Sequence, residues 1–312
     1  MDRTFDLLAF VIERDLSVLS ISLPHIRHFL RPERIVFVAP QACLGKLDKE
    51  GMRREGDLLL DENALAPGLS LASVRGLIAS RGGDESRAGW YFKQIAIFAY
   101  AFRRDAPAHY LTWDSDTVPV RPIRFFDEEG RALLARKHEY HRSYFEAIER
   151  LTALKRQAKF SFIAEHMLFE GEIVRDMVTT MLRGRPFDGG LLAATILGAV
   201  SDRDLAASGF SEYETYGTFA YAKHRDRISV RRIPSIRHGT AFFKRLPTEA
   251  QLFAVSRAFH WASFESWDLS VGIQRALRLL TRLFGLVWVA AALATGSAAY
   301  GRFKREIDAA RE

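Results

Sequence analysis

The sequence predicts an α/β fold, a mostly parallel sheet flanked by helices, followed by a helical C-terminal region. Two patterns support this prediction. Short apolar runs of strand length alternate with segments of helical spacing through the first two thirds of the 312 residues. Near the C-terminus the pattern changes to a long, largely apolar segment with basic residues. We expect one α/β domain over residues 1–245 and a helical region over residues 246–312.

Five apolar runs predict the strands of the sheet. The run over residues 34–40 is almost wholly apolar and β-branched, and it closes at Pro40. Such a run is typical of a strand buried on both faces at the centre of a parallel sheet. The predicted strands cover residues 5–11, 34–40, 57–61, 108–114 and 131–135.

Helical spacing occupies the intervals between these strands. Residues 15–30 carry apolar side chains at helical intervals, and Pro24 is a position where that helix could kink or restart. Residues 89–104 predict a second helix, which is rich in aromatic residues. Residues 161–182 fit either one helix or a strand followed by a helix.

Composition excludes several classes of protein. With 48% hydrophobic residues the chain has ample apolar surface to fold, which excludes intrinsic disorder. The single cysteine, Cys43, excludes a disulfide scaffold and fits a reducing compartment. Asp2 and Asp6 stand where an export signal needs basic residues, so we expect a cytoplasmic protein.

The net charge of +7 suggests a nucleic-acid partner at first sight. The arginine clusters are scattered dipeptides, however, and no helix-turn-helix or zinc-ligand spacing accompanies them. Residues 269–305 contribute +6 of the charge, with six basic residues and no acid. The rest of the chain is therefore nearly neutral, and we expect no nucleic-acid partner.

The same segment contains 19 uncharged, mostly apolar residues between Arg282 and Arg302. Three interpretations remain open. The segment could be a buried helix that caps the domain, a helix lying on an anionic membrane surface, or a transmembrane span. The basic flanks favour the second, a peripheral contact at the inner face of the cell membrane.

The segment most informative about chemistry is the apolar strand that runs directly into Asp114-Ser115-Asp116. Ligands bind outside the carboxyl ends of the strands of a parallel sheet. Two carboxylates at such an end can face one hard divalent cation, which would bridge a diphosphate. The same residues also suit an ordinary turn.

This strand followed by Trp113-Asp114-Ser115-Asp116 resembles the metal-binding motif of GT-A type nucleotide-sugar glycosyltransferases, which have a Rossmann-like sheet. The surrounding pattern is similar to the bacterial DUF6492-like group. The resemblance covers residues 5–245 and implies a metal-dependent transfer of a sugar from a nucleoside-diphosphate donor, with inversion favoured. The matching pieces are residues 89–94, 113–117, 166–169, 210–217 and 237–239.

The resemblance implies a role for each metal-site residue. Asp116 would ligate Mn²⁺ or Mg²⁺ directly, and Asp114 would contact the ribose or the water shell of the metal. His238 would be a further metal ligand, and an imidazole ligand favours Mn²⁺ over Mg²⁺. The alternative for His238 is an ordinary surface or core histidine.

Glu212 and Glu214 are the candidates for the catalytic base. Inverting transfer needs one carboxylate to accept the proton of the acceptor hydroxyl. In an extended chain both side chains point the same way. At a helix start, Ser211 and Glu214 instead form a capping box. We therefore predict Glu212 as the base and Glu214 as a contact to the sugar or the acceptor.

Four further residues are predicted to contact substrate. Lys93 could contact phosphate and Gln94 the sugar, at the start of the aromatic helix. Trp113 belongs to the motif, and His166 is a candidate contact on the acceptor side. A histidine within the core is the alternative for His166.

We therefore expect a glycosyltransferase with a nucleoside-diphosphate-sugar donor and a glycan or glycolipid acceptor at the cell surface, such as lipopolysaccharide or capsule. A metal-dependent nucleotidyl- or phosphotransferase would use the same acids, but no Gly-rich phosphate loop is present in the sequence. A non-catalytic GT-A-like nucleotide-sugar-binding protein is the other alternative, and the presence of Asp114, Asp116 and Glu212 speaks against it.

Overall fold

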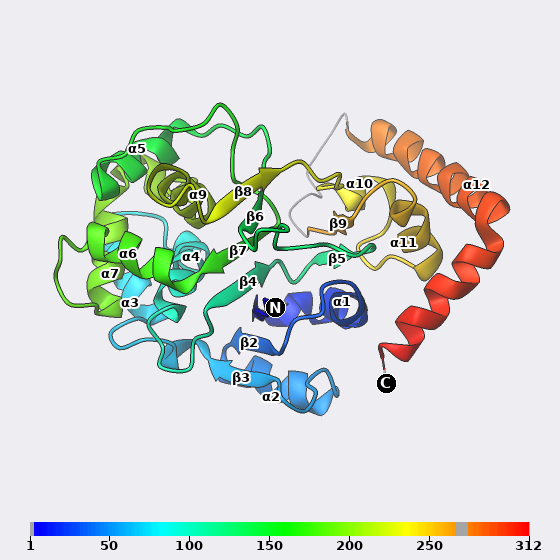
Figure 1. The fold of residues 1–312 in the computed structure, drawn as a ribbon, viewed down its shortest axis with the longest axis horizontal. Helices are drawn as coiled ribbons and strands as arrows, with labels where there is room; N and C mark the ends of the chain where they lie inside the picture. Colours follow the sequence, from blue (N-terminus) through cyan, green and yellow to red (C-terminus); the bar gives the residue numbers. More distant parts are fainter. Residues whose placement is uncertain (1–2, 266–273, 312) are drawn as a thin grey trace.

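The computed structural model describes residues 3–265 and 274–311, and the side chains of residues 274–280 are outside that description. Its centre is a five-stranded sheet in the order β3-β2-β1-β4-β7 (Figure 1). All neighbouring pairs are parallel except β4 and β7. The predicted mostly parallel α/β sheet is therefore confirmed. The strands are β1 (Asp6–Phe10), β2 (Ile35–Ala39), β3 (Leu58–Asp61), β4 (His109–Trp113) and β7 (His166–Glu170).

The five residues of β2 are all buried, as predicted from their continuous apolar run. Leu7 and Leu8 of the neighbouring β1 are fully buried as well, so both faces of the sheet are covered. The predicted strands at residues 5–11, 34–40, 57–61 and 108–114 are present with ends shifted by a residue or so. Residues 161–182 resolve into a strand, β7, followed by a helix, so the strand–helix alternative is correct.

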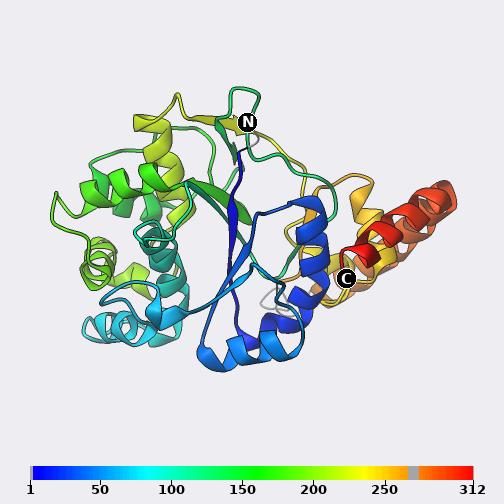
Figure 2. The same ribbon diagram turned by 60° about the horizontal axis from the view of Figure 1, so that its bottom comes forward.

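The order of the strands places a reversal beside β1. The chain runs outward from β1 to β2 and β3, and then returns to place β4 on the other side of β1. Because crossovers between parallel strands are right-handed, this reversal moves the connecting helices to the opposite face of the sheet. Figure 2 shows helices on both sides of the strands. The neighbouring strands β1 and β4 thus enclose the position where ligands bind in open α/β sheets.

The helices form two layers around the sheet. Helix α1 (Leu16–Phe29) continues through Pro24 without a break. The aromatic helix α4 (Ala88–Tyr100) ends four residues earlier than predicted. The layer containing α4 also includes α3, α6, α7 and α9, which pack on it or on one another. The remaining bounds in that layer and its surroundings are α2 (Gln41–Lys49), α3 (Leu71–Ala79), α5 (Arg142–Thr152), α6 (Gly171–Met181), α7 (Gly189–Ala199), α8 (Asp202–Leu205) and α9 (Glu212–Lys223).

Two small strand pairs extend this body. β5 (Thr117–Pro119) pairs antiparallel with β9 (Trp261–Ser263), and β6 (Ala132–Ala135) pairs parallel with β8 (Ile228–Arg231). The β5–β9 pair joins the end of the predicted Asp-x-Asp turn to a segment beyond residue 245. The C-terminal region is consequently not purely helical, because it supplies a buried strand to the body.

Helix α10 (Gly239–Phe242) precedes the C-terminal region. That region otherwise contains α11 (Glu249–Ser256) and α12 (Gln274–Ala309), with α12 lying along one edge of the molecule (Figure 1). Its inner face packs on α10 and α11. A Cβ atom at Gly285 would lie 2.7 Å from the carbonyl oxygen of Phe242, so only glycine fits there. Trp288 stacks on Phe243 with ring centroids 6.0 Å apart. Gly296 has non-helical backbone angles and kinks the helix.

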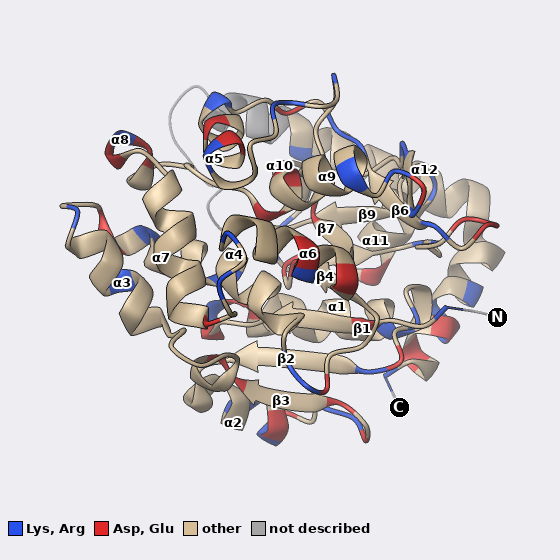
Figure 3. Ribbon diagram, turned by 60° about the vertical axis from the view of Figure 1, so that its left-hand side comes forward, with Lys and Arg blue, Asp and Glu red and all other residues tan. Residues whose placement is uncertain are grey.

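The outer face of α12 is apolar. Leu283, Phe284, Leu286 and Val287 are 50–67% exposed. Other surface helices, such as α5 and α8, carry charges of both signs (Figure 3). The stretch Thr281–Ala309 is long and apolar enough to cross a membrane, judged by length and composition alone. Thus α12 has one apolar face on the body and a second apolar face toward the surroundings.

Candidate active site

Acidic residues follow both strands at the reversal point of the sheet. The chain leaves β1 and reaches Asp15 at the end of a short 3₁₀ helix (Glu13–Asp15). It leaves β4 directly into Asp114, Ser115 and Asp116. Since β1 and β4 are paired neighbours, these two turns lie at the same edge of the sheet. The predicted position of the Asp-x-Asp turn, outside the carboxyl end of a parallel strand, is therefore where the fold puts it.

The backbone of this turn is fixed by hydrogen bonds on three sides. The Thr117 amide donates to the Asp114 carbonyl at 3.0 Å and closes the turn. The Phe264 amide donates to the Asp116 carbonyl at 2.8 Å, and the Asp114 amide donates to the Glu165 carbonyl at 3.2 Å. Segments distant in sequence therefore hold the two carboxylates in place.

Lys93 of α4 is the cation that faces these acids. Its Nζ lies 2.6 Å from Asp114 Oδ1. Burial lowers the pKa of Lys93, but the carboxylates of Asp114, Glu212 and Asp116 outweigh burial and raise it overall. Lys93 is therefore firmly charged, and its charge is shared among several carboxylates.

Asp116 is the least compensated of the pair. Burial, together with the charges of Asp114 and Asp15, raises the pKa of its carboxyl to about 7, although Lys93 opposes the shift. Asp114 holds the direct ion pair with Lys93, so little positive charge remains for Asp116. The site thus carries more negative charge than its own cations neutralise.

Glu212 is the first residue of α9. Ser211 caps that helix, because its Oγ accepts from the Glu214 amide at 3.2 Å. The segment is therefore a helix start and not an extended strand. Burial raises the pKa of Glu212 to about 7, Lys93 opposes the shift, and Asp114 adds to it. The structure thus brings the predicted base into the electrostatic surroundings of Lys93 and Asp114.

Gln94 and Glu214 have internal partners. Gln94 Oε1 accepts from the Glu212 amide at 3.0 Å, and its Nε2 donates to the Trp90 carbonyl at 3.3 Å. Glu214 Oε2 accepts from Ser161 Oγ at 2.6 Å and from the Phe162 amide at 3.2 Å. Both side chains are buried. Gln94 and Glu214 hold the backbone around Glu212. Their predicted contacts with the sugar or acceptor stay predictions, and these internal hydrogen bonds speak against them.

Trp113 and His166 lie in the core beneath the turn. Each is 2% exposed, and their rings stack with centroids 5.0 Å apart. Trp113 Nε1 donates to the Thr117 carbonyl at 2.8 Å. Burial, with the charges of Arg231 and Lys137, holds the pKa of His166 well below its usual range. His166 therefore has the surroundings of a histidine within the core, the alternative given above. A substrate contact stays a prediction for both Trp113 and His166.

Three residues that the sequence analysis did not single out join the carboxylates. Asp15 is buried, and Arg245 Nη2 donates to its Oδ1 at 2.7 Å. Glu265 follows β9, which pairs with the strand after Asp116. Burial raises the pKa of Glu265 to about 8, Arg237 opposes the shift, and Asp116 and Asp114 add to it. The signal for Glu265 was the one used for Asp114, an acid directly after an apolar run.

His238 precedes α10 as its N-terminal cap residue and is exposed. Its neighbour Arg237 reaches Glu265, with Nε 3.8 Å from Oε1. Over residues 3–265 and 274–311, no three His, Cys, Asp or Glu side chains are arranged to hold a metal ion. The predicted set of Asp114, Asp116 and His238 is therefore not a preformed three-ligand site.

The donor chemistry nevertheless fits a hard divalent cation. The charge of Asp116 raises the pKa of Glu265, so the negative charge of these two carboxylates is poorly neutralised. Glu265 Oε2 is also buried without a hydrogen-bond partner in the described structure. Mg²⁺ and similar cations are commonly held by one or two carboxylates plus the phosphates of a substrate, not by an all-protein cage. Residues of this kind suit a cation that arrives with a diphosphate.

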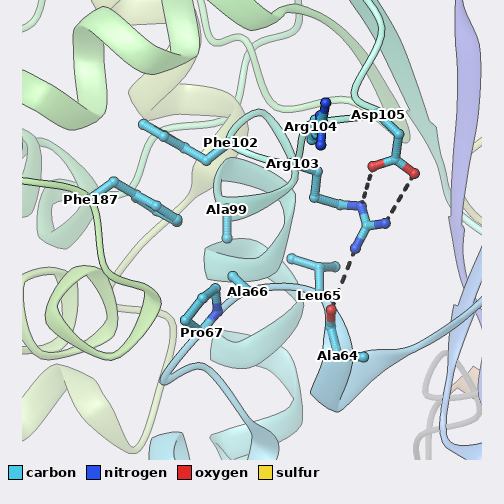
Figure 4. A pocket seen from close by; sticks show the side chains of 10 residues that line it. All are labelled: Ala64, Leu65, Ala66, Pro67, Ala99, Phe102, Arg103, Arg104, Asp105 and Phe187. Atoms are coloured by element: carbon cyan, nitrogen blue, oxygen red, sulfur yellow. Dashed lines mark hydrogen bonds and ion pairs between the residues drawn. The ribbon is translucent and has the colours of Figure 1, made fainter.

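A separate surface hollow of about 670 Å³ lies away from these residues (Figure 4). Its floor is apolar, and Phe102 and Phe187 stack there with ring centroids 3.8 Å apart. Its one acid, Asp105, is held by Arg103 through two hydrogen bonds of 2.9 and 3.0 Å. None of the carboxylates described above lines this hollow, so it offers no comparable chemistry.

No family model matches the chain, and no curated protein matches it by sequence. The bacterial DUF6492-like grouping therefore stays a prediction. The solved structures to which the chain is similar are glycosyltransferases. Mouse xyloside xylosyltransferase 1 is 12% identical, over 86% of this chain and 99% of that one, with a TM-score of 0.40. The galactosyltransferase LgtC, solved with donor and acceptor sugar analogues, is 10% identical, over 89% of this chain and 95% of that one, also with a TM-score of 0.40.

Streptococcus pneumoniae GlyE, described as a glycosyltransferase, is 12% identical, with a TM-score of 0.41. The match covers 94% of this chain and 64% of GlyE, so the chain spans less than two thirds of that protein. Such low identities and TM-scores carry no argument about activity. The case for a function has to come from the side chains of this chain.

Proposed function

We propose that the protein is a GT-A type glycosyltransferase that moves a sugar from a nucleoside-diphosphate donor to a glycan or glycolipid acceptor. The observation that carries the proposal is the excess of carboxylates at the point where the strand order reverses. Asp114 and Asp116 lie there beside the charged Lys93 and the buried Glu212. The excess of negative charge suits a bound cation and the diphosphate leaving group that the cation would neutralise. The buried carboxylate of Glu212 beside it suits a base.

Each residue has a defined task in this proposal. Asp116 and Asp114 would hold Mn²⁺ or Mg²⁺, with Glu265 as a further carboxylate in their electrostatic surroundings and His238 as the predicted imidazole ligand. The bound cation would neutralise charge on the diphosphate. Lys93 pairs with Asp114 and adds a positive charge that a phosphate oxygen can share. Asp15 and Arg245 fix the opposite wall, at the end of β1.

Glu212 would act as the base in an inverting transfer. The acceptor hydroxyl oxygen attacks the anomeric carbon, and the bond from that carbon to the diphosphate breaks. The bonding electron pair leaves with the diphosphate, and the hydroxyl proton moves to Glu212. A base whose pKa lies near 7 is matched to this task at neutral pH. Gln94, which accepts from the Glu212 amide, holds the base in position.

The decisive experiment is a screen of nucleotide-sugars with the full-length protein. Release of a nucleoside diphosphate, dependent on Mn²⁺ or Mg²⁺ and on one sugar donor, is expected. Thermal stabilisation by that donor should likewise require the cation. Stabilisation by DNA alone, with no response to any nucleotide-sugar, would contradict the proposal.

For location, we propose that α12 lies on the anionic inner face of the cell membrane. One face of the helix packs on α10 and α11, so it could cross a bilayer only by leaving the body. The outer face exposes Leu283, Leu286 and Val287, and exposed basic residues, Arg282 and Arg302, flank the apolar stretch. An apolar face with cationic ends is the pattern of an interfacial helix.

The double variant Leu286→Glu with Val287→Glu tests this location. We expect roughly tenfold weaker binding to vesicles of anionic lipid, because it removes apolar contact and adds two negative charges. Leu246→Glu is the matched control, since Leu246 is also 50% exposed but lies outside α12. Equal vesicle binding by wild type and both variants, or a wild type that never binds vesicles, would contradict it.

A further inference from the structure

Arg231 is a half-buried residue whose guanidinium has no counter-charge among the described residues. It ends strand β8, and its carbonyl accepts from the Arg136 amide at 2.9 Å. Its guanidinium Nε and Nη2 are buried and have no hydrogen-bond acceptor within the described structure. Leaving a buried charge unpaired costs several kcal/mol, so guanidinium groups at such depth normally have an anionic partner. The missing partner requires an explanation.

The surroundings of Arg231 are basic and aromatic. Its guanidinium carbon lies 6.0 Å from the centre of the Phe125 ring. Its charge lowers the pKa of two histidines, His166 and His260, after the larger effect of burial on each. Burial lowers the pKa of Arg231 itself to about 10, and no carboxylate opposes that shift. Lys137 and Arg121 act on the same two histidines.

Other buried nitrogen atoms in this region also lack hydrogen-bond partners among the described residues. Both ring nitrogens of His166 and Nδ1 of His260 are buried without a hydrogen bond. Glu165, which precedes His166 in the chain, accepts from the Trp261 indole at 3.0 Å and lies 3.7 Å from Lys137 Nζ. The region therefore combines unused hydrogen-bond donors with an excess of positive charge.

Within this region, His166 lies beneath the acidic turn, whereas His260 lies at the far end of the β5–β9 pair from that turn. Asp116 and Phe264 are bonded at one end, and the Val120 amide donates to the His260 carbonyl at 2.8 Å at the other. Val120 is four positions after Asp116, which is about 13 Å of strand. That separation is comparable to one or two sugar rings, so a molecule held at the acidic end could reach the basic end.

We propose that Arg231 is the centre of an oxyanion-binding subsite that receives a phosphate or carboxylate group carried by the acceptor. The planar guanidinium presents two unpaired donors, the arrangement with which arginine binds phosphate and carboxylate through paired hydrogen bonds. Assigning the anion to the acceptor rests on the proposed glycosyltransferase function. Binding of the anion does not, because it depends only on Arg231 and its neighbours.

The first test measures anion binding without any nucleotide-sugar. Inorganic phosphate is titrated into the full-length protein at constant ionic strength, with chloride as the balancing anion, and followed by calorimetry and thermal unfolding. Wild type should bind phosphate and unfold at a higher temperature. Arg231→Gln should bind roughly 10- to 100-fold more weakly, because hydrogen bonds to a charged group are lost. Arg231→Lys should recover part of the affinity.

Arg232→Gln is the matched control, because Arg232 is the exposed neighbour of Arg231 and has the same charge. It should bind phosphate as wild type does. Equal binding by wild type, Arg231→Gln and Arg232→Gln would overturn the proposal, because it would show only nonspecific attraction. Absence of any phosphate binding to wild type would overturn it as well.

A second set of titrations identifies the source of the anion. A hexose phosphate and a hexuronate should compete with inorganic phosphate if the group is carried by a soluble glycan. Vesicles of anionic lipid should compete instead if a lipid headgroup supplies it, and Arg231→Gln should abolish either competition. Once a transfer assay exists, Arg231→Gln should raise KM for an anionic acceptor while leaving KM for the donor unchanged. A failed transfer screen with intact phosphate binding would reject the enzyme and retain the subsite.

Discussion

The two ends of the β5–β9 pair are opposite in charge and alike in being incompletely neutralised. At one end, Asp116 and Glu265 are acids whose pKa values burial and the charges of neighbouring acids raise to about 7 and about 8. At the other, Arg231 is a cation whose pKa burial lowers to about 10. A folded chain tolerates such charges only at a cost in stability. The difference in sign indicates what each end would bind, a cation with its diphosphate at the first and an oxyanion at the second.

Removing Asp116 should have the largest effect on function. Asp116→Ala should abolish cation-dependent donor binding and reduce transfer by about 10³-fold or more, since charge neutralisation at the leaving group is then lost. Donor affinity is measured by calorimetry with and without Mn²⁺. Ser115→Ala, between the two acids, is the control and should retain both activities. A fully active Asp116→Ala variant would remove Asp116 from the proposed metal site.

Glu212 and Glu214, two residues apart, should separate catalysis from stability. Glu212→Gln should lower kcat by roughly 10²- to 10⁴-fold and leave donor binding intact, because only the proton acceptor is lost. Glu214→Gln should instead lower the free energy of unfolding, because Glu214 accepts charge-assisted bonds from Ser161 and Phe162. Transfer that survives in Glu212→Gln would show that another group, such as Glu265, takes the proton.

The acidic end was only partly predictable from the sequence. Asp114 and Asp116 were recognisable because an apolar strand runs straight into them, and β4 ends at Trp113 as that pattern requires. Glu265 lies 149 residues after Asp116, and only the pairing of β9 with β5 brings it there. Glu265 also follows an apolar run, but long-range strand pairing has no local signal in one sequence, so its place beside the Asp114–Asp116 turn could not be predicted.

The roles of buried polar residues were harder to predict than the fold. Gln94 and Glu214 are polar residues beside a candidate base, which made them look like substrate contacts. Their partners, the Glu212 amide and the Ser161 hydroxyl, come from other elements and are visible only in three dimensions. Arg231 appeared in the sequence as half of a scattered Arg-Arg pair. Only its burial without a partner distinguishes it from the exposed Arg232.

Replacing Asp116 by a residue that cannot ionise should raise the free energy of unfolding at high pH, which an exposed surface carboxylate would not do. The folded-state pKa of Asp116 lies above its ordinary value of 3.8, so its contribution to stability is fully present below about pH 4 and is lost as pH rises through about 7. Asp116→Asn cannot ionise. In cation-free buffer it should exceed wild type in stability at pH 8, by about 2 kcal/mol, and show no gain at pH 4. Thermal and urea unfolding at both values measure this difference.

The gain at pH 8 should disappear when Mn²⁺ and donor are added, because wild type then binds the cation that Asp116→Asn cannot. A variant that is less stable than wild type at pH 8 without cation would contradict the surplus of negative charge at this end.

Removing the charge of Arg231 at the basic end should also raise the free energy of unfolding. The gain should be smaller than at the acidic end and should depend differently on pH. Arg231→Met removes a buried unpaired charge and retains much of the side-chain volume, so in anion-free buffer it should raise the free energy of unfolding by about 1 kcal/mol. The guanidinium stays charged far above neutrality, so this gain should persist from pH 5 to pH 8, whereas that of Asp116→Asn appears only as the pH rises. Phosphate should cancel it by stabilising wild type alone. Arg232→Met, at the exposed neighbour, should change nothing in either buffer. A loss of stability in Arg231→Met without anion would mean that Arg231 has a stabilising role in the folded body and that the two ends are not alike.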